Sequence, residues 1–333
     1  MTIVTKTALP TEHLRLALDH RDHRPPAVTL LEGAASALAA QHAPSSSADP
    51  HELTLAEFDA VLEPGSKIYW LYMRPAGRPI MTLGLLRDAV TALEHLGHLF
   101  EASPEAPPAR YTVMSSSMPG IFNLGGDLRY FVNLIRNQNR VMLAKYGQAC
   151  IEPQYIRSTK MNLPIISISL VQGDALGGGF ECALADDVII AERSAKFGLP
   201  ECLFSLFPGM GALSFLTRKV GAAIAEKMVF SGKIYSAGEM HEMGIVDVLV
   251  EDGMGEQAVY DFVDRNERSF AARRSVYAAR QVISPITRAE LDRIVDMWVD
   301  AALSLGPTDL RIMERLAGAQ DRRCAMVGQA VAS

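Results

Sequence analysis

The chain has 333 residues, of which 49% are hydrophobic and 21% charged, with a formal net charge of -6. This length and apolar content predict a substantial core, in two domains or in one domain with appendages. The acidic balance excludes the broad basic surface that nucleic-acid binding requires. No stretch approaches the roughly 20 apolar residues that cross a bilayer, and residues 1–6 do not resemble a secretory signal, so we expect a cytoplasmic protein without membrane insertion.

The N-terminal part of the chain differs in composition from the rest. It contains Pro25-Pro26, an alanine-rich segment at residues 34–40 and a run of proline and serine at residues 44–50. This composition predicts an extension over residues 1–64, partly helical and joined by a flexible linker. An α/β core is expected over residues 65–262 and a helical region over residues 263–333.

Strands and helices are expected to alternate along the core. Apolar runs and helical periodicity predict strands at Ile68–Met73, Tyr111–Ser115, Ile165–Val171 and Val188–Ala191, and helices at Leu83–Leu99 and Phe180–Ala185. This alternation indicates the α/β class.

Helical patterns dominate the C-terminal third. Capping boxes are expected at Ser236–Glu239 and Thr287–Glu290, and the segment after the second ends before Gly306-Pro307. A last helix is expected from Asp309, with an apolar face formed by Leu310, Met313 and Leu316. The face of the preceding helix consists of Leu291, Ile294, Val295, Trp298 and Ala302. Such faces are core, the wall of an acyl pocket or a subunit contact, and the sequence leaves the three open.

Two glycine clusters follow strand-like segments. Gly177 to Gly179 precede a helical segment, where close backbone approach and unpaired N–H groups create a site for negative charge. Gly125-Gly126 stand in a similar position. Two amide donors that converge on one oxygen would form an oxyanion hole. Each cluster alone could equally be a tight turn. Neither a dinucleotide-binding G-x-G-x-x-G nor a serine-hydrolase G-x-S-x-G pattern occurs.

Two glutamates stand in apolar surroundings. Glu181 follows the second glycine cluster, and Glu201 lies in the segment Phe197 to Phe204. A buried carboxylate has to be paired, protonated or used for proton transfer, so each could be an ion-pair partner or a catalytic group. Two carboxyl groups at one acyl group can divide the removal of an α-proton and the protonation of a β-hydroxyl between them.

The cysteines do not form a metal site. Cys150, Cys182, Cys202 and Cys324 lack the short spacings of zinc ligands or redox pairs, which predicts reduced and mostly buried thiols. We expect no metal ion and no bound cofactor.

The motifs together resemble the crotonase (enoyl-CoA hydratase/isomerase) superfamily from about Ile68 onward. The resemblance implies a spiral of repeated ββα units with a C-terminal helical oligomerisation region. It places the oxyanion amides at Gly126 and Gly178, and the two hydratase glutamates at Glu181 and Glu201. Gly125, Gly177, Gly209, Met210, Trp298 and Leu316 are expected to contact the substrate.

Within the superfamily, the sequence is most similar to the diffusible signal factor (DSF) synthases of bacterial quorum sensing. The similar segments are Phe122–Leu128, Val171–Glu181, Leu206–Ala212, Trp298–Asp300 and Met313–Leu316. The resemblance implies dehydration of a 3-hydroxyacyl carrier-protein thioester to the cis-2-enoyl form, followed by hydrolysis of the thioester.

Two other functions remain open on the sequence. The glutamate pair equally fits a trans-2-enoyl-CoA hydratase of fatty-acid oxidation, and the fold could instead serve as an acyl-binding regulatory module. The resemblance also implies acyl carrier protein or CoA as the carrier, a signal-receptor protein as a partner, and a homotrimer or dimer of trimers.

Overall fold

The computed structural model describes residues 49–331 apart from residue 76. The predicted helical segment at residues 34–40 and most of the predicted linker at residues 44–50 lie outside this part of the chain. Within it, no helix is both long enough and apolar enough to pass through a membrane.

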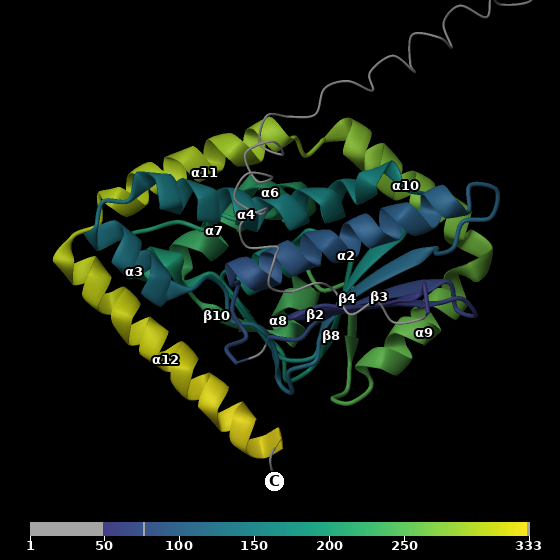
Figure 1. The fold of residues 1–333 in the computed structure, drawn as a ribbon, viewed down its shortest axis with the longest axis horizontal. Helices are drawn as coiled ribbons and strands as arrows, with labels where there is room; N and C mark the ends of the chain where they lie inside the picture. The colour runs from purple at the N-terminus through teal and green to yellow at the C-terminus, as the bar shows by residue number, and fades with distance from the viewer. Residues whose placement is uncertain (1–48, 76, 332–333) are drawn as a thin grey trace, which may run out of the picture. The chain divides into compact units, whose positions relative to one another are not determined.

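A seven-stranded sheet forms the centre of the described structure (Figure 1). Its order is β1-β2-β3-β4-β6-β8-β11, antiparallel from β1 to β3 and parallel from β3 to β11. The strands are β1 (Glu52–Thr54), β2 (Phe58–Glu63), β3 (Ile68–Met73), β4 (Tyr111–Ser116), β6 (Ile166–Val171), β8 (Val188–Glu192) and β11 (Val248–Val250). The four strands predicted from the sequence are confirmed as β3, β4, β6 and β8.

A second, four-stranded sheet has the order β10-β9-β7-β5. It consists of β5 (Ile121–Asn123), β7 (Asp174–Leu176), β9 (Lys196–Gly198) and β10 (Ile234–Ser236). Each of β5, β7 and β9 directly follows a strand of the large sheet, and helical structure comes after it. The expected spiral of ββα units is therefore confirmed.

Helices cover both faces of the large sheet. The α-helices of the described residues are α2 (Leu83–Ala102), α3 (Leu128–Arg136), α4 (Arg140–Thr159), α5 (Gly178–Leu184), α6 (Ala212–Val220), α7 (Ala222–Ser231), α8 (Ala237–Glu242), α9 (Gly255–Asn266), α10 (Phe270–Ile283), α11 (Arg288–Leu303) and α12 (Pro307–Val331). The short 3₁₀ helices are η3 (Lys160–Asn162), η4 (Pro200–Phe204) and η5 (Glu267–Ser269).

The alternation of side chains along the strands divides the core in two. Tyr69 and Leu71 of β3 join the main apolar cluster with α2 and α4, whereas Ile68 and Trp70 face the opposite side, where α9 packs. In Figure 1, α2 and α4 lie above the sheet and α9 lies below it. All six residues of β6 are buried, as expected for a strand covered on both faces.

The predicted domain boundaries are wrong in two places. β1 and β2 precede residue 65 but belong to the sheet, because β2 pairs along its whole length with β3. Phe58, Ala60 and Leu62 alternate with less buried positions, as in a strand with one face on the core. The second boundary, after residue 262, falls inside α9.

The expected helix signals act as caps. Ser236 and Glu239 form a complete capping box at α8, and the Thr287 side chain accepts a hydrogen bond from the Glu290 N–H at α11. α11 ends at Leu303, and Pro307 is the first residue of α12, two residues earlier than the predicted start. Proline suits that position because its missing N–H would have no partner in the first turn.

Candidate active site

The first glycine turn connects β5 to α3. Gly125 has φ +89°, a left-handed conformation that glycine adopts without strain. Its N–H donates to Asn123 Oδ1 (2.8 Å), and its C=O accepts from the Met81 N–H (2.8 Å). Among the described residues, the N–H of the next residue, Gly126, meets no hydrogen-bond acceptor.

The second glycine turn connects β7 to α5. Gly177 has φ +49°, and Gly178 is the first residue of α5. The Gly178 N–H has no acceptor in the described part of the chain, as expected at a helix N-terminus that lacks a side-chain cap. A Cβ on Gly179 would come within 2.0 Å of the Asn123 carbonyl oxygen, so only glycine allows α5 to pack on β5 at this point.

The two turns touch each other. A Cβ on Gly125 would lie 3.0 Å from the Gly178 nitrogen and 2.7 Å from the Leu176 carbonyl oxygen. Two unpaired N–H groups, at Gly126 and Gly178, therefore belong to adjoining turns that line one cavity. An oxyanion hole requires two such N–H groups that converge on one oxygen.

Glu181 lies one turn into α5 and is 1% exposed. Its Oε1 accepts hydrogen bonds from the N–H groups of Met210 (2.8 Å) and Ala212 (3.0 Å). Burial raises the pKa of Glu181 to about 7, although these two N–H groups act in the opposite direction.

Glu201 stands in η4, on the other side of Gly177. A Cβ on Gly177 would come within 2.8 Å of the Glu201 Oε1. The Glu201 Oε2 is buried without a hydrogen-bond partner among the described residues. Burial, and next the charge of Glu181, raise the pKa of Glu201 to about 8. The charge of Glu181 thus influences the ionisation of Glu201.

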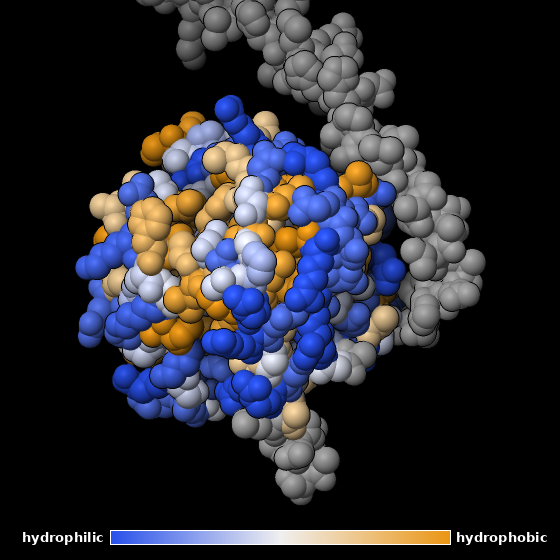
Figure 2. All heavy atoms as spheres, turned by 90° about the vertical axis from the view of Figure 1, so that its left-hand side faces the viewer, coloured by the Kyte–Doolittle hydropathy of each residue, from blue (hydrophilic) through white to orange (hydrophobic). Residues whose placement is uncertain are grey.

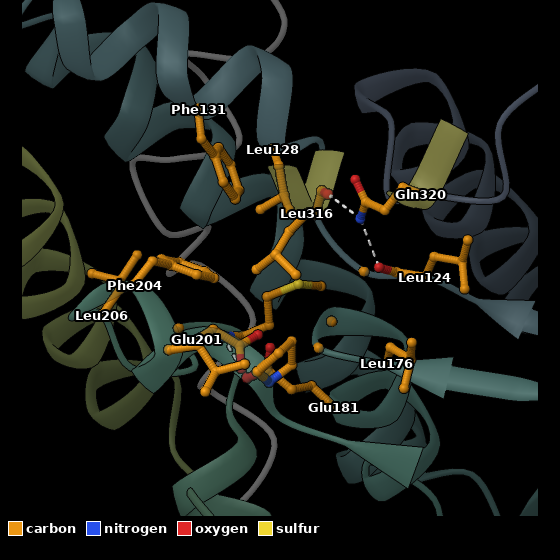
Figure 3. Close-up of a pocket in the computed structure, with 18 of the residues that line it drawn as sticks. Leu124, Leu128, Phe131, Leu176, Glu181, Glu201, Phe204, Leu206, Leu316 and Gln320 are labelled. Atoms are coloured by element: carbon orange, nitrogen blue, oxygen red, sulfur yellow. Dashed lines mark hydrogen bonds between the residues drawn. The ribbon is translucent and has the colours of Figure 1, made fainter. Parts of the chain in front are cut away.

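A cavity of about 390 Å³ joins the turns and the glutamates. All ten residues that the sequence assigns to the site line it: Gly125, Gly126, Gly177, Gly178, Glu181, Glu201, Gly209, Met210, Trp298 and Leu316. The lining is mostly apolar, and its charged residues besides the glutamates are Asp174 and Arg323, whose side chains form an ion pair. Figure 3 shows Leu316 and Phe131 on the opposite side of the cavity from the glutamates.

The apolar wall is closely packed around Trp298 of α11. Its ring packs edge-on against Phe131, with 5.1 Å between the centroids. On its other side it leaves no room for a Cβ on Gly209, which would come within 2.6 Å of the indole. Trp298 is therefore both a core residue and a wall of the cavity, whereas Leu291, Val295 and Ala302 of the same predicted face are core.

The apolar lining continues to the surface at Leu203 and Ile234, which are 51% and 45% exposed. The side of the molecule on which α3 and α12 lie in Figure 1 has an apolar area in its middle, bordered by hydrophilic side chains (Figure 2).

Besides Asp174 and Arg323, two uncharged polar residues of the lining were not indicated by the sequence. Tyr146 of α4 is buried, donates to the Met81 carbonyl oxygen and accepts from the Asp127 N–H (3.3 Å). Gln320 of α12 donates through Nε2 to the carbonyl oxygens of Leu124 (2.8 Å) and Gly126 (3.2 Å). Neither residue lies in a motif, and both reach the site from distant parts of the chain.

The cysteines match the prediction of reduced thiols within the described residues. Cys150 and Cys182 are buried, and Cys202 is half-buried. The Cys182 side chain contacts Arg157, whose guanidinium donates to its sulfur (2.8 Å) and forms a buried ion pair with Asp186. Burial raises the pKa of the Cys182 thiol, which disfavours a nucleophilic role.

A spiral of ββα units in which two glycine turns and a pair of glutamates line one cavity defines the crotonase fold class. The sequence profile of the enoyl-CoA hydratase/isomerase family matches residues 88–281, more than half of the chain. The chain belongs to this family.

Curated relatives are similar over the same region. A mitochondrial methylglutaconyl-CoA hydratase of Rattus norvegicus is 28% identical over 195 residues, and a probable mitochondrial enoyl-CoA hydratase 2 of Arabidopsis thaliana is 31% identical over 193 residues. Each alignment covers 57% of this chain and 60% of the relative. The chain thus matches less than two thirds of the length of these proteins.

Solved structures share the fold over more of the chain. An enoyl-CoA hydratase of Bacillus halodurans superposes with a TM-score of 0.64 at 18% identity, covering 79% of this chain and 100% of that one. DspI of Pseudomonas aeruginosa superposes with a TM-score of 0.57 at 25% identity, covering 76% of this chain and 98% of that one.

Proposed function

We propose that the protein is a crotonase-type hydro-lyase that acts on fatty acyl thioesters. The observation that carries this proposal is the meeting, in one apolar cavity, of two unpaired N–H groups, the buried Glu181 and the half-buried Glu201, both with raised pKa values. A 3-hydroxyacyl thioester offers a matching set of groups: a carbonyl oxygen, an α-proton, a β-hydroxyl and an apolar tail.

Dehydration would proceed by proton transfers alone, without a cofactor. The N–H groups of Gly126 and Gly178 bind the thioester oxygen and stabilise the negative charge that develops as the α-proton leaves; one such donor is typically worth about 3 kcal/mol. The ionised member of the Glu181–Glu201 pair takes the α-proton, and the protonated member gives its proton to the departing hydroxyl. With pKa values of about 7 and about 8, the pair would supply both forms at a pH between these values.

We further propose that this reaction is that of a DSF synthase, in which the cis-2-enoyl thioester is then hydrolysed to the free acid. The support is the similarity of the segments that build the site, among them Leu206–Ala212, which supplies the N–H groups that hold Glu181. For release, a glutamate would activate water while the same N–H groups stabilise the tetrahedral intermediate. The carrier would be acyl carrier protein or CoA, and a signal-receptor protein would be a partner.

A trans-2-enoyl-CoA hydratase is the second candidate function. It is favoured by the relatives described as hydratases, whose names refer to CoA thioesters. A purely acyl-binding module is a weaker candidate, because binding alone does not require two buried carboxyl groups with raised pKa values beside the two N–H groups.

Product analysis of the purified full-length protein separates these functions. A DSF synthase converts 3-hydroxyacyl carrier protein to free cis-2-enoic acid, which mass spectrometry detects. A hydratase instead adds water to trans-2-enoyl-CoA and releases no acid. Glu181→Gln and Glu201→Gln should each lower either activity by about 10² to 10⁴-fold. A wild-type protein that binds the acyl thioester but turns over neither substrate would support the binding module.

We also propose a cytoplasmic homotrimer or dimer of trimers formed through the C-terminal helices. α10 has no buried side chain within the described chain, yet Val276, Val282 and Ile283 on it are apolar and exposed. A helix of this kind is suited to a subunit contact. Light scattering coupled to size exclusion measures the assembly, and a monomer would contradict it.

A further inference from the structure

In the loop from Leu124 to Asp127, the N–H groups of the residues before and after Gly126 are all hydrogen-bonded. The Leu124 N–H donates to the Pro79 carbonyl oxygen (2.7 Å) and the Gly125 N–H to Asn123 Oδ1. The Asp127 N–H donates to the Tyr146 hydroxyl. Among the described residues, the Gly126 N–H is thus the donor of this loop that is left for a ligand.

The direction of that N–H depends on its own peptide group and on the two beside it. Because a trans peptide points its C=O and N–H in opposite directions, the bond from Met81 N–H to the Gly125 C=O turns the Gly126 N–H away from Met81. Two successive glycines, however, resist rotation of this peptide less than any other pair of residues. A flip would present the Gly125 carbonyl oxygen, rather than an N–H, to the cavity.

Gln320 holds the two flanking peptides with one side chain. Its Nε2 donates to the Leu124 C=O, in the peptide before the donor, and to the Gly126 C=O, in the peptide after it. Figure 3 shows both bonds leaving the same nitrogen. An amide with two N–H donors can make both bonds, which neither a carboxylate nor an apolar side chain can do.

The position of Gln320 is in turn fixed by ion pairs of α12. The neighbouring Asp321 pairs with Arg78 (3.0 Å) and Arg129, and Arg323 pairs with Asp174 (2.9 Å). These contacts connect α12 to the segment before α2, to α3 and to β7. The Gln320 carboxamide therefore approaches the loop from a helix that ion pairs connect to three other parts of the fold.

We propose that Gln320 is a positioning residue, which orients the Gly126 N–H towards the thioester oxygen by bridging the peptides on either side of it. This inference rests on the proposed use of that N–H in an oxyanion hole. It assigns to α12, which lies outside the matched family segment, a part in setting the polarity of the substrate carbonyl.

The test measures carbonyl polarisation directly. A saturated acyl-CoA labelled with ¹³C at the thioester carbonyl is bound to the full-length protein, and its C=O stretch is recorded by difference infrared spectroscopy. In the wild type, two N–H donors should shift the band to lower frequency. Gln320→Leu and the isosteric Gln320→Glu should both reduce this shift and lower kcat by about 10- to 100-fold, with KM changed by less than about threefold.

The matched control is Gln257→Leu, the same change at an exposed glutamine of α9 that donates to Asp261. It should leave the band and the turnover unchanged. A side chain that merely fills space would be replaced by Gln320→Glu without loss. If both Gln320 variants show the full wild-type shift, the inference is overturned while the proposed function stands. If the wild type binds the thioester with no shift, the oxyanion hole and the proposed function fall with it.

Discussion

The raised pKa values of Glu181 and Glu201 make the proposed activity depend on the protonation of this pair. With pKa values of about 7 and about 8, the pair is doubly protonated in acid and doubly ionised in base. We expect a bell-shaped plot of kcat/KM against pH, with its maximum between these values, because dehydration needs one acid and one base. Glu181→Gln or Glu201→Gln should remove one limb and lower kcat by about 10² to 10⁴-fold. A profile that stays flat from pH 6 to pH 9 would contradict the roles of the pair.

The same raised pKa predicts how Glu201 affects stability. The folded state holds this proton more tightly than the unfolded state, whose carboxyl titrates near 4.5, so the free energy of unfolding decreases as pH rises from about 4.5 to about 8. Glu201→Gln removes the titration. The variant should therefore gain stability relative to the wild type as pH rises, by more than about 1 kcal/mol between pH 5 and pH 9.

Thermal unfolding at the two pH values measures this difference, with Glu94→Gln, at an exposed position of α2, as the control. An equal difference in Tm between variant and wild type at both pH values would show that Glu201 does not carry a raised pKa.

At the scale of elements, Trp298 of α11 forms part of the apolar wall of the cavity. Its ring is 6% exposed and fills the space between Phe131 and Gly209. Trp298→Ala should extend the range of acyl chains that the enzyme accepts, and should destabilise the fold by about 3–5 kcal/mol because it leaves a void. Values of kcat/KM across a series of chain lengths measure the first effect, with Trp298→Phe as the conservative comparison. An unchanged preference in Trp298→Ala would place the end of the acyl chain elsewhere.

Sequence patterns predicted the elements that carry continuous apolar signals. β3, β4, β6 and β8 are buried runs bounded by turns, and the two glycine turns and both glutamates lie in short contiguous motifs. The apolar face of α11 was equally visible, but its division into core and cavity wall was not, because that depends on which helix lies opposite. Val295 packs on α4 at Gly147, whereas Trp298 reaches the site.

What the sequence could not predict are contacts between distant parts of the chain. Gln320 is separated from the loop it contacts by 194 residues, and the glutamine itself carries no periodic or motif signal. β1 and β2 were missed because the change in composition around residue 64 resembled a domain boundary. Because both strands are short, the alternation of their side chains can be recognised as strand structure only from the pairing of β2 with β3 and of β1 with β2.

At the scale of the whole molecule, the segments on either side of the matched family segment form parts of the large sheet and of the cavity. The match to the family covers residues 88–281, yet the large sheet begins at Glu52 and the cavity is lined by residues as far as Arg323. The segments outside the match add the antiparallel edge of the sheet and one wall of the site. Both the stability of the sheet and the shape of the cavity therefore depend on them.

The position of β1 and β2 predicts how far the chain can be shortened from its N-terminus. A chain that begins at residue 49 keeps both strands, whereas one that begins at residue 65 loses them and exposes the backbone edge of β3 together with Tyr69 and Leu71, which are at most 1% exposed in the full structure. Unpaired apolar edges promote aggregation. We expect the first chain to melt cooperatively and the second to be insoluble or to lack a cooperative transition, as measured by circular dichroism and light scattering. Equal solubility and equal Tm would show that the core begins after β2 and that the two strands are an appendage.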